Sequence, residues 1–239
     1  MSFLYTFLLW FVLPSGWKQH TSSRQPACCI VNLRYSFGDA YRLDYDTIGR
    51  LETVTRLQGN FINRFLYRGD TVIAESFIDG LADEKTIYVI NRNGLVTWAR
   101  EGKTDGSTWH IRIFEYDGMQ LRKVTHTDYL GAAYTSYEVY TWRNGNPVKI
   151  AYYDARKKPD GVNTFQYYED QASRPGDYWS ETALLTGMRS LQPKNLLKSI
   201  SGPETTRISY VFDSKGKITG MKEAEDWDTR TCMYQYKCN

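Results

Sequence analysis

The sequence has few cysteines and histidines, and it has no block of charge of one sign. Its 239 residues include 4 Cys and 3 His, and they are too scattered to give a metal-ligand spacing. The 30 basic and 27 acidic residues give a net charge of +3 and alternate along the chain, which does not favour nucleic acid as a partner. Glycines of the Walker or dinucleotide-binding kind are also missing, because the glycines stand in turn contexts. We therefore expect no metal, no cofactor and no nucleic-acid partner.

Only one long hydrophobic run is present, at residues 3–13. It is too short to span a bilayer as a helix and has the length of a signal-peptide core. No Lys or Arg precedes it, and Ala27-Cys28, a candidate lipoprotein cleavage site, lies well downstream with Gln25 in place of the usual Leu. We interpret residues 1–31 as a signal-like or poorly ordered segment, with a mistaken start codon or a buried first strand as alternatives. Export predicts a secreted or cell-envelope location.

The four cysteines stand near the two ends of the chain, as Cys28, Cys29, Cys232 and Cys238. Adjacent cysteines rarely bridge each other, whereas Cys232 and Cys238 could close a small loop in an oxidising compartment. The alternative is that the thiols stay free or partly buried.

A hairpin unit recurs along the chain. In the first copy, residues 41–45 alternate between apolar and polar side chains as a half-buried strand does, residues 46–49 supply a turn, and Arg50-Leu51 begins the returning strand. Asn, Asp and Gly accept the positive φ that tight hairpin turns require. The turn glycines of five copies are spaced by 20, 25, 24 and 27 residues, at Gly49, Gly69, Gly94, Gly118 and Gly145. This repeat predicts successive antiparallel hairpins.

Short turns between neighbouring strands predict an all-β fold, an antiparallel up-and-down meander in one domain over residues 32–239. A sheet of roughly ten or more strands is expected to be strongly curved or barrel-like. The exception is a short helical insertion near 178–197. Asp177 can cap a helix through Leu185, with Gly187 after it, and this insertion could plug or cap the curled sheet.

The repeated turns carry a resemblance. Tyr-Asp-x-x-Gly-Arg-Leu at 45–51 and Phe-Asp-x-x-Gly-Lys-Ile at 212–218 resemble tyrosine-aspartate repeats of the Rhs type. Residues 34–236, with Lys-Asn-Leu-Leu at 194–197, are similar to a family of secreted Bacteroidetes domains of unknown function described as having a porin-like fold. The resemblance implies an exported β-meander or barrel-like envelope protein, and it supplies no functional residues.

Catalytic signals are weak. His20, His110 and His126 have no Cys, Ser or His partner at a recognised spacing, and we interpret the histidines in the strand-like runs as solvated. Asp44 and Asp46 read as a turn cap and a solvated edge rather than as acid-base machinery. Further acidic loops lack the spacing of a known calcium loop; they contain Asp154, Asp160, Glu223, Glu225 and Asp226. No catalytic residue is predicted.

Aromatic side chains are the remaining candidate site. They account for 15% of the chain and are mostly Tyr and Trp, which stack on apolar ring faces and keep a polar tip in water. In a purely structural interpretation, these residues form cross-strand ladders that stiffen the sheet. The functional one is a ligand-binding platform made by Trp98, Trp109, Tyr116, Tyr140, Trp142, Tyr153 and Tyr167.

We therefore expect a non-catalytic secreted or envelope protein that binds a glycan, peptide or envelope component on a curved sheet. It would be peripheral to a membrane at most, because the strand candidates lack an unbroken apolar band. The alternatives are a polysaccharide-active enzyme that uses loop carboxylates and a membrane-spanning β-barrel.

Overall fold

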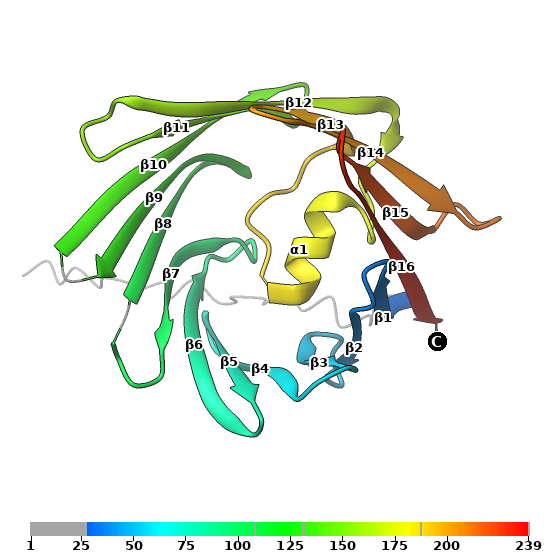
Figure 1. Cartoon of the computed structure of the whole chain (residues 1–239), viewed down its shortest axis with the longest axis horizontal. Coiled ribbons are helices and arrows are strands. Elements are labelled where there is room, and N and C mark those ends of the chain that lie inside the picture. The colour runs from blue at the N-terminus through cyan, green and yellow to red at the C-terminus, as the bar shows by residue number, and fades with distance from the viewer. Residues whose placement is uncertain (1–27, 108, 131, 187, 239) are drawn as a thin grey trace, which may run out of the picture.

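The described part of the chain forms a closed antiparallel barrel of sixteen strands with one helix inside it (Figure 1). The computed structural model describes residues 28–107, 109–130, 132–186 and 188–238. Each strand pairs with its neighbours in sequence, and β16 returns to pair with β1. The predicted all-β meander of hairpins is therefore confirmed, and its curvature reaches full closure.

The strands alternate with short turns along nearly the whole chain. Their bounds are β1 (Cys28–Tyr35), β2 (Ala40–Tyr45), β3 (Leu51–Arg56), β4 (Phe61–Arg68), β5 (Thr71–Ile78), β6 (Leu81–Ile90), β7 (Val96–Lys103), β8 (Trp109–Asp117), β9 (Gln120–Leu130), β10 (Ala132–Arg143), β11 (Asn146–Tyr153), β12 (Pro159–Ala172), β13 (Asn195–Ser201), β14 (Thr205–Phe212), β15 (Ile218–Ala224) and β16 (Thr229–Cys238). The helix, α1 (Tyr178–Thr186), stands between β12 and β13.

At four hairpins, the side chain of the first turn residue accepts hydrogen bonds from the backbone of the turn. The Asp46 carboxylate accepts hydrogen bonds from the backbone N–H groups of Ile48 (3.0 Å) and Arg50 (2.9 Å), and Gly49 has φ +83°. The same pair of bonds is made at three other hairpins, by Asn91, Asp154 and Asp213. A side-chain oxygen that bonds the turn's own backbone fixes the reversal locally. The five predicted turn glycines all have positive φ.

Helix α1 begins at the predicted cap. The Asp177 carboxylate accepts the backbone N–H of Ser180 at 2.7 Å, which satisfies one of the orphan donors of the first turn. Inside the barrel the helix packs Tyr178, Trp179 and Leu184 against the core, and Figure 1 shows it within the ring of strands. The short insertion is thus confirmed as a plug. Its last residues, from Asn195 on, belong to β13, and Gly187 lies outside the described residues.

Glu181 joins the helix to the wall. Its side chain, only 5% exposed, accepts a hydrogen bond from the Tyr35 hydroxyl and lies 3.3 Å from Nη2 of Arg230. Burial raises the pKa of Glu181, against the opposing effects of the Tyr35 hydrogen bond and the Arg230 charge. The guanidinium also pairs with Glu223. This buried network fixes α1 against β1 and β16.

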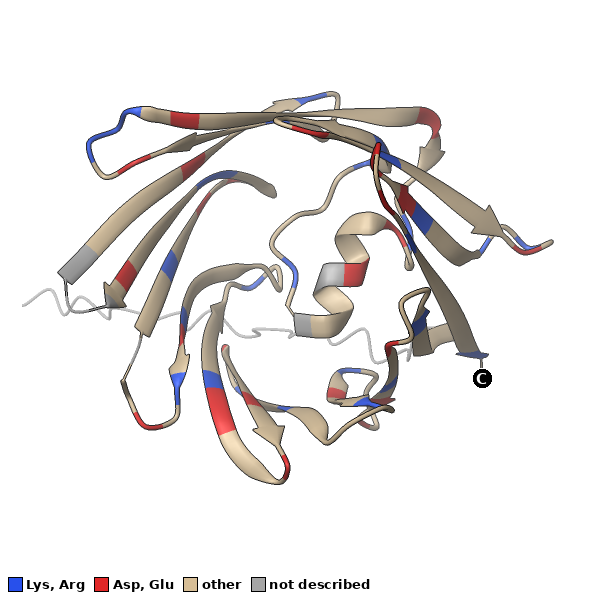
Figure 2. Cartoon of the chain, viewed as in Figure 1, with Lys and Arg blue, Asp and Glu red and all other residues tan. Residues whose placement is uncertain are grey.

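A hydrophobic core occupies the interior beside the Glu181 network, and further charged side chains stand on the outer face. Buried wall residues that meet in one cluster include Leu33, Leu43, Val54, Val72, Val96, Leu121, Leu197, Ile208 and Met221. On the outer face, Arg64, Glu75 and Lys85 lie side by side across β4, β5 and β6, with Lys85 Nζ 3.0 Å from the Glu75 carboxylate. Figure 2 shows acidic and basic residues around the wall. Among the described helical residues, none form a segment long and apolar enough to cross a membrane.

The seam between β1 and β16 is closed by a disulfide. Cys28 and Cys238 are register partners and are bonded to each other, whereas Cys29 and Cys232 are free thiols. The small Cys232–Cys238 loop considered from the sequence is therefore not formed, because Cys232 points into the core, where it is 1% exposed. β1 begins at Cys28, four residues before the expected boundary at 32, since these residues pair with β16. Residues 1–27, with the apolar run and His20, lie outside the described residues.

Candidate functional site

The seven aromatic residues predicted as a platform do not share one surface. Strand alternation sends three to the outer face, Trp98, Trp109 and Tyr153, and four to the interior, Tyr116, Tyr140, Trp142 and Tyr167. Successive side chains on a strand point to opposite faces, so the sequence pattern supplied aromatics to both sides. The structure therefore divides the candidate site in two.

The inward aromatics hold the wall together. The Tyr116 hydroxyl donates to the carbonyl of Val96 (2.8 Å), Trp142 Nε1 donates to that of Leu121 (2.7 Å), and the Tyr167 hydroxyl donates to that of Pro147 (2.8 Å). Burial raises the pKa of Tyr116, Tyr140 and Tyr167. Each polar tip already has a protein partner, which is how buried Tyr and Trp are usually satisfied. Tyr116, Trp142 and Tyr167 act as cross-strand ties, whereas the Tyr140 hydroxyl donates to Glu138 on its own strand.

Two of the outward aromatics, Trp98 and Tyr153, belong to a row that crosses five strands. Register pairs connect Trp98 to Ile113, Thr125, Tyr137 and Tyr153, from β7 to β11. Ile113 is 46% exposed. Directly opposite residues in a sheet lie about 4.5 to 5.5 Å apart, so the row forms one continuous stripe of mainly apolar and aromatic side chains. We call it the outer aromatic row.

Two features flank the outer aromatic row. Trp109 lies on the outer face of β8, at the first residue of that strand. The Arg100 guanidinium carbon lies 3.3 Å from the centroid of the Trp109 ring. At the β11 end of the row, a hollow of about 250 Å³ is lined by Lys123, Tyr137, Val139, Tyr153 and Lys157. Lys123 Nζ is 5.1 Å from the Tyr137 ring centroid and 2.9 Å from the Glu115 carboxylate. Flat ring faces and cationic rims thus occur together on this side of the barrel.

The structure also brings together a polar cluster that the sequence did not predict. His110 Nε2 is 3.2 Å from His126 Nδ1, and His126 Nε2 is 3.0 Å from the Glu138 carboxylate, which also accepts the Tyr140 hydroxyl. Asp128 lies 3.8 Å from His110. The histidines were interpreted as solvated and unpartnered, and this was wrong. Both face the barrel interior; alternation along β8 places His110 on the same side as Tyr116, whereas the side of His126 depends on a register shift.

When both imidazoles are neutral, the hydrogen bonds of this cluster favour one arrangement of its protons. An ionised Glu138 accepts from His126 Nε2–H, so His126 Nδ1 is left to accept from His110 Nε2–H. Burial raises the pKa of Glu138, but the bonds from His126 and Tyr140 outweigh burial and hold it below its ordinary value. Burial lowers the pKa of His110. Among the described residues, no serine or cysteine side chain is hydrogen-bonded to either histidine, so the chain of groups ends without a nucleophile.

Several of the acidic residues considered from the sequence are used in turns and surface pairs, and Glu223 belongs to the buried network with Arg230. Asp46 and Asp154 cap hairpins, and Asp44 pairs with Arg42 at 3.1 Å. Within the described part of the chain, no group of three or more His, Cys, Asp and Glu side chains is placed to hold a metal ion.

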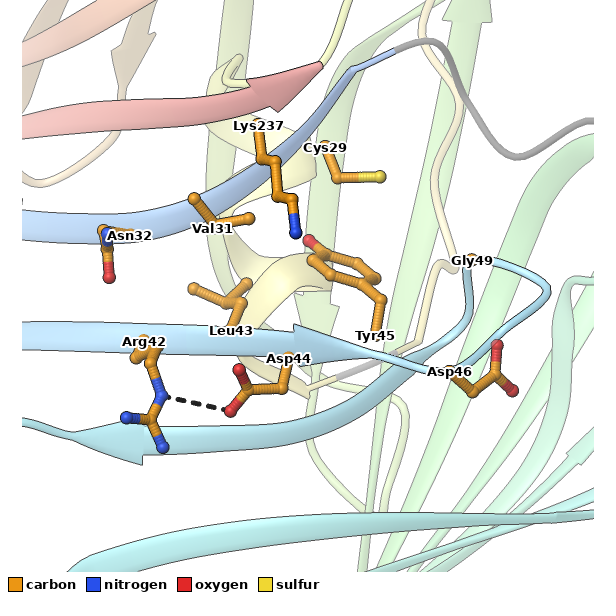
Figure 3. A pocket seen from close by; sticks show the side chains of 10 residues that line it. All are labelled: Cys29, Val31, Asn32, Arg42, Leu43, Asp44, Tyr45, Asp46, Gly49 and Lys237. Atoms are coloured by element: carbon orange, nitrogen blue, oxygen red, sulfur yellow. Dashed lines mark hydrogen bonds and ion pairs between the residues drawn. The ribbon is translucent and has the colours of Figure 1, made fainter. Parts of the chain in front are cut away.

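A further hollow, of about 420 Å³, lies where β1 and β2 separate (Figure 3). These strands pair only from Asn32 to Arg34, and the Tyr45 hydroxyl bridges the separation by donating to the carbonyl of Ile30 at 2.7 Å. Acidic and basic side chains both line this hollow, so its charges largely balance.

The fold and its inward core define a closed sixteen-stranded barrel, and comparison with solved structures gives the same class. The chain is similar to a porin-like protein from Bacteroides uniformis ATCC 8492 (TM-score 0.63, 16% identity, 89% of this chain and 98% of that chain). It is also similar to a porin-like protein from Bacteroides vulgatus ATCC 8482 (TM-score 0.59, 12% identity, 86% and 97%). No protein-family model matches the chain, and no curated protein matches its sequence. The porin-like fold implied by the resemblance is confirmed.

Proposed function

We propose that this protein is a non-catalytic protein of the cell envelope or the secreted fraction, and that its outer aromatic row binds a carbohydrate. The observation that carries the proposal is the row itself, in which Trp98, Tyr137 and Tyr153 lie on one outward stripe. Aromatic faces stack on the apolar faces of sugar rings, and polar groups at the rim bind the hydroxyls. Lys123 and Lys157 supply such a rim.

Two observations support the location. The Cys28–Cys238 disulfide closes the barrel, and structural disulfides persist in oxidising, extracytoplasmic compartments. The solved structures of similar fold carry the description porin-like. A location outside the cytoplasm agrees with both.

The outer charges favour a barrel peripheral to the membrane over the membrane-spanning alternative. Arg64, Glu75 and Lys85 stand in mid-strand on the outer face, and each charge would cost about 2 to 4 kcal/mol near a bilayer midplane. The interior is meanwhile filled by apolar side chains and α1. The inner face also carries charged groups, among them Glu138 and Arg230, so the preference rests on the outer charges and on the helix inside the barrel.

The test is a panel of polysaccharides and oligosaccharides, screened for binding and for product formation. Wild type is compared with the double variant Trp98→Ala/Tyr153→Ala. The matched control is Trp227→Ala, because Trp227 is 73% exposed in the β15–β16 turn, away from the row.

We expect binding without turnover, weakened at least tenfold in the double variant and unchanged in the control. Product formation would contradict the non-catalytic assignment. Equal binding by all three proteins would remove the outer aromatic row as the site.

A further inference from the structure

The barrel wall opens between β13 and β14. These strands pair over only three residue pairs, from Ser199–Arg207 to Ser201–Thr205, although both continue beyond them. The Tyr168 hydroxyl, from β12, reaches across and donates to the carbonyl of Ile208 on β14 at 3.0 Å. One side chain thus replaces ladder hydrogen bonds at the opening, and space is left beside it.

A hollow of about 490 Å³ occupies this opening. Its lining combines cationic side chains with hydroxyl groups, and it contains no carboxylate. The residues are Gln166, Tyr168, Lys198, Ser199, Ser201, Thr205, Arg207, Ile208, Ser209, Lys222 and Ala224.

The three cations of this hollow are poorly neutralised. Lys198 Nζ lies 5.9 Å from the Tyr168 ring centroid, and neither Lys198 nor Lys222 forms an ion pair among the described residues. Arg207 is 3.6 Å from Asp226, and both side chains are more than two-thirds exposed. Three positive charges with one peripheral carboxylate leave an excess of two positive charges. The exposed Arg207–Asp226 pair neutralises Arg207 only weakly.

The hollow between β1 and β2 provides an internal comparison. It is built in the same way, around a short strand pairing bridged by a tyrosine hydroxyl. Its lining, however, contains Asp44 and Asp46 beside Arg42 and Lys237. An opening in the wall therefore does not by itself require a one-signed lining, and the positive charge at β13–β14 is a separate property of that site.

We propose that the hollow between β13 and β14 binds a phosphate group, carried by a phosphorylated sugar or by a lipid headgroup. A dianion matches the excess of positive charge. Arg207 presents the planar donor fork that binds phosphate oxygens in pairs, and Lys198 and Lys222 add point charges. The hydroxyls of Ser199, Ser201 and Ser209 can donate to the remaining oxygens. This site lies on strands other than those of the outer aromatic row and is independent of the proposed function.

The test is isothermal titration calorimetry at low ionic strength with inorganic phosphate, glucose 6-phosphate and glucose. Flotation with phosphatidylcholine vesicles, with and without phosphatidylglycerol, tests the lipid source. The site variant is Lys198→Gln/Lys222→Gln, and the matched control is Lys149→Gln/Lys215→Gln. All four lysines are exposed, so both variants lose the same charge without disturbing the core.

Glucose 6-phosphate and inorganic phosphate should bind, glucose should not, and the site variant should weaken binding at least tenfold while the control changes it less than twofold. If only vesicles with phosphatidylglycerol bind, and only the site variant abolishes that binding, the phosphate group belongs to a lipid headgroup. Equal weakening in both variants would show a general effect of net charge and overturn the proposal. Absence of binding to all of these probes at millimolar concentration would do the same.

Discussion

Gly118 tests the hairpin assignment with little interference from packing. It lies in the β8–β9 turn at φ +59°, and a Cβ added there would meet no atom within 4 Å. Replacement by Val therefore acts mainly through the backbone preference. Gly161, on β12, is the matched control, because its φ is not in the left-handed region and its added Cβ would lie at an ordinary 3.7 Å from Tyr152 Cδ2.

The expected magnitude follows from these geometries. An L-residue in the left-handed region costs about 1 to 2 kcal/mol, and a β-branched one is among the least tolerant. At Gly161 the same substitution restricts the unfolded chain and suits a strand, which stabilises by about 0.5 kcal/mol. We therefore expect Gly118→Val to be roughly 2 kcal/mol less stable than Gly161→Val. Gly145→Val should be less stable still, because its Cβ would lie 3.1 Å from that of Lys194.

The assay is urea unfolding with the disulfide intact, followed by tryptophan fluorescence. The midpoint should fall in Gly118→Val with an unchanged slope, since the surface exposed on unfolding is the same. Thermal midpoints should separate by roughly 4 to 8 °C for a chain of this length. Equal stability of the Gly118 and Gly161 variants would refute the turn assignment.

Three further predictions concern the seam, the histidine cluster and the helix. Cys28→Ser should cost about 3 to 5 kcal/mol of unfolding free energy, because the disulfide spans 210 residues; Cys29→Ser is the control, and equal stability of the two variants would contradict a seam closed by Cys28. The folded pKa of Glu138 is depressed, so the stability that this carboxylate contributes is present above its ordinary pKa of 4.5 and is lost as the pH falls through the folded pKa. In Glu138→Gln the urea midpoint should therefore fall less steeply with decreasing pH below 4.5. An unaltered pH dependence of the midpoint would exclude this role. Arg230→Met should lower the unfolding free energy by roughly 2 to 4 kcal/mol, because it leaves the buried Glu181 carboxylate without its cation. Glu181→Gln should lower it less in the same urea titration, since the amide oxygen still accepts the hydrogen bond from Tyr35. A larger loss in Glu181→Gln than in Arg230→Met would count against the network.

Turn residues made the barrel predictable. Asp46 and Gly49 specify a reversal through bonds within five residues, so the turn needs no distant partner. Repetition of that local device produces antiparallel neighbours, and a long meander must curl. Asp177 predicted the start of α1 in the same way, since a helix cap is also a local signal.

The histidine cluster was not predictable because it depends on a register shift. A bulge lies between Glu115 and Tyr116, and beyond it Arg112 stands opposite His126 and His110 opposite Asp128. Counting back from the turn without the bulge would place His126 on the face opposite to His110, because a one-residue slip exchanges the two faces. The sequence contains no local mark of this bulge.

The Cys28–Cys238 bond and the division of the aromatic residues between the two faces of the wall could not be predicted, for a related reason. Cys28 meets Cys238 only because the sixteen strands close into a barrel, and no local sequence pattern predicts that closure. Trp98 and Tyr116 both stand on aromatic strands, yet one faces outward and the other donates to Val96 in the interior. Face assignment needs the register of every strand between them.

The central claim is that the wall faces water and the interior is filled, despite the porin-like fold. It is tested most directly by adding the purified protein to planar lipid bilayers while following its dispersity without detergent. We expect a monodisperse protein that produces no stepwise ion conductance, because the outer charges of β4–β6 and the inner plug α1 oppose insertion and flow. Stepwise conductance, or recovery of the folded protein only in detergent micelles, would contradict the account.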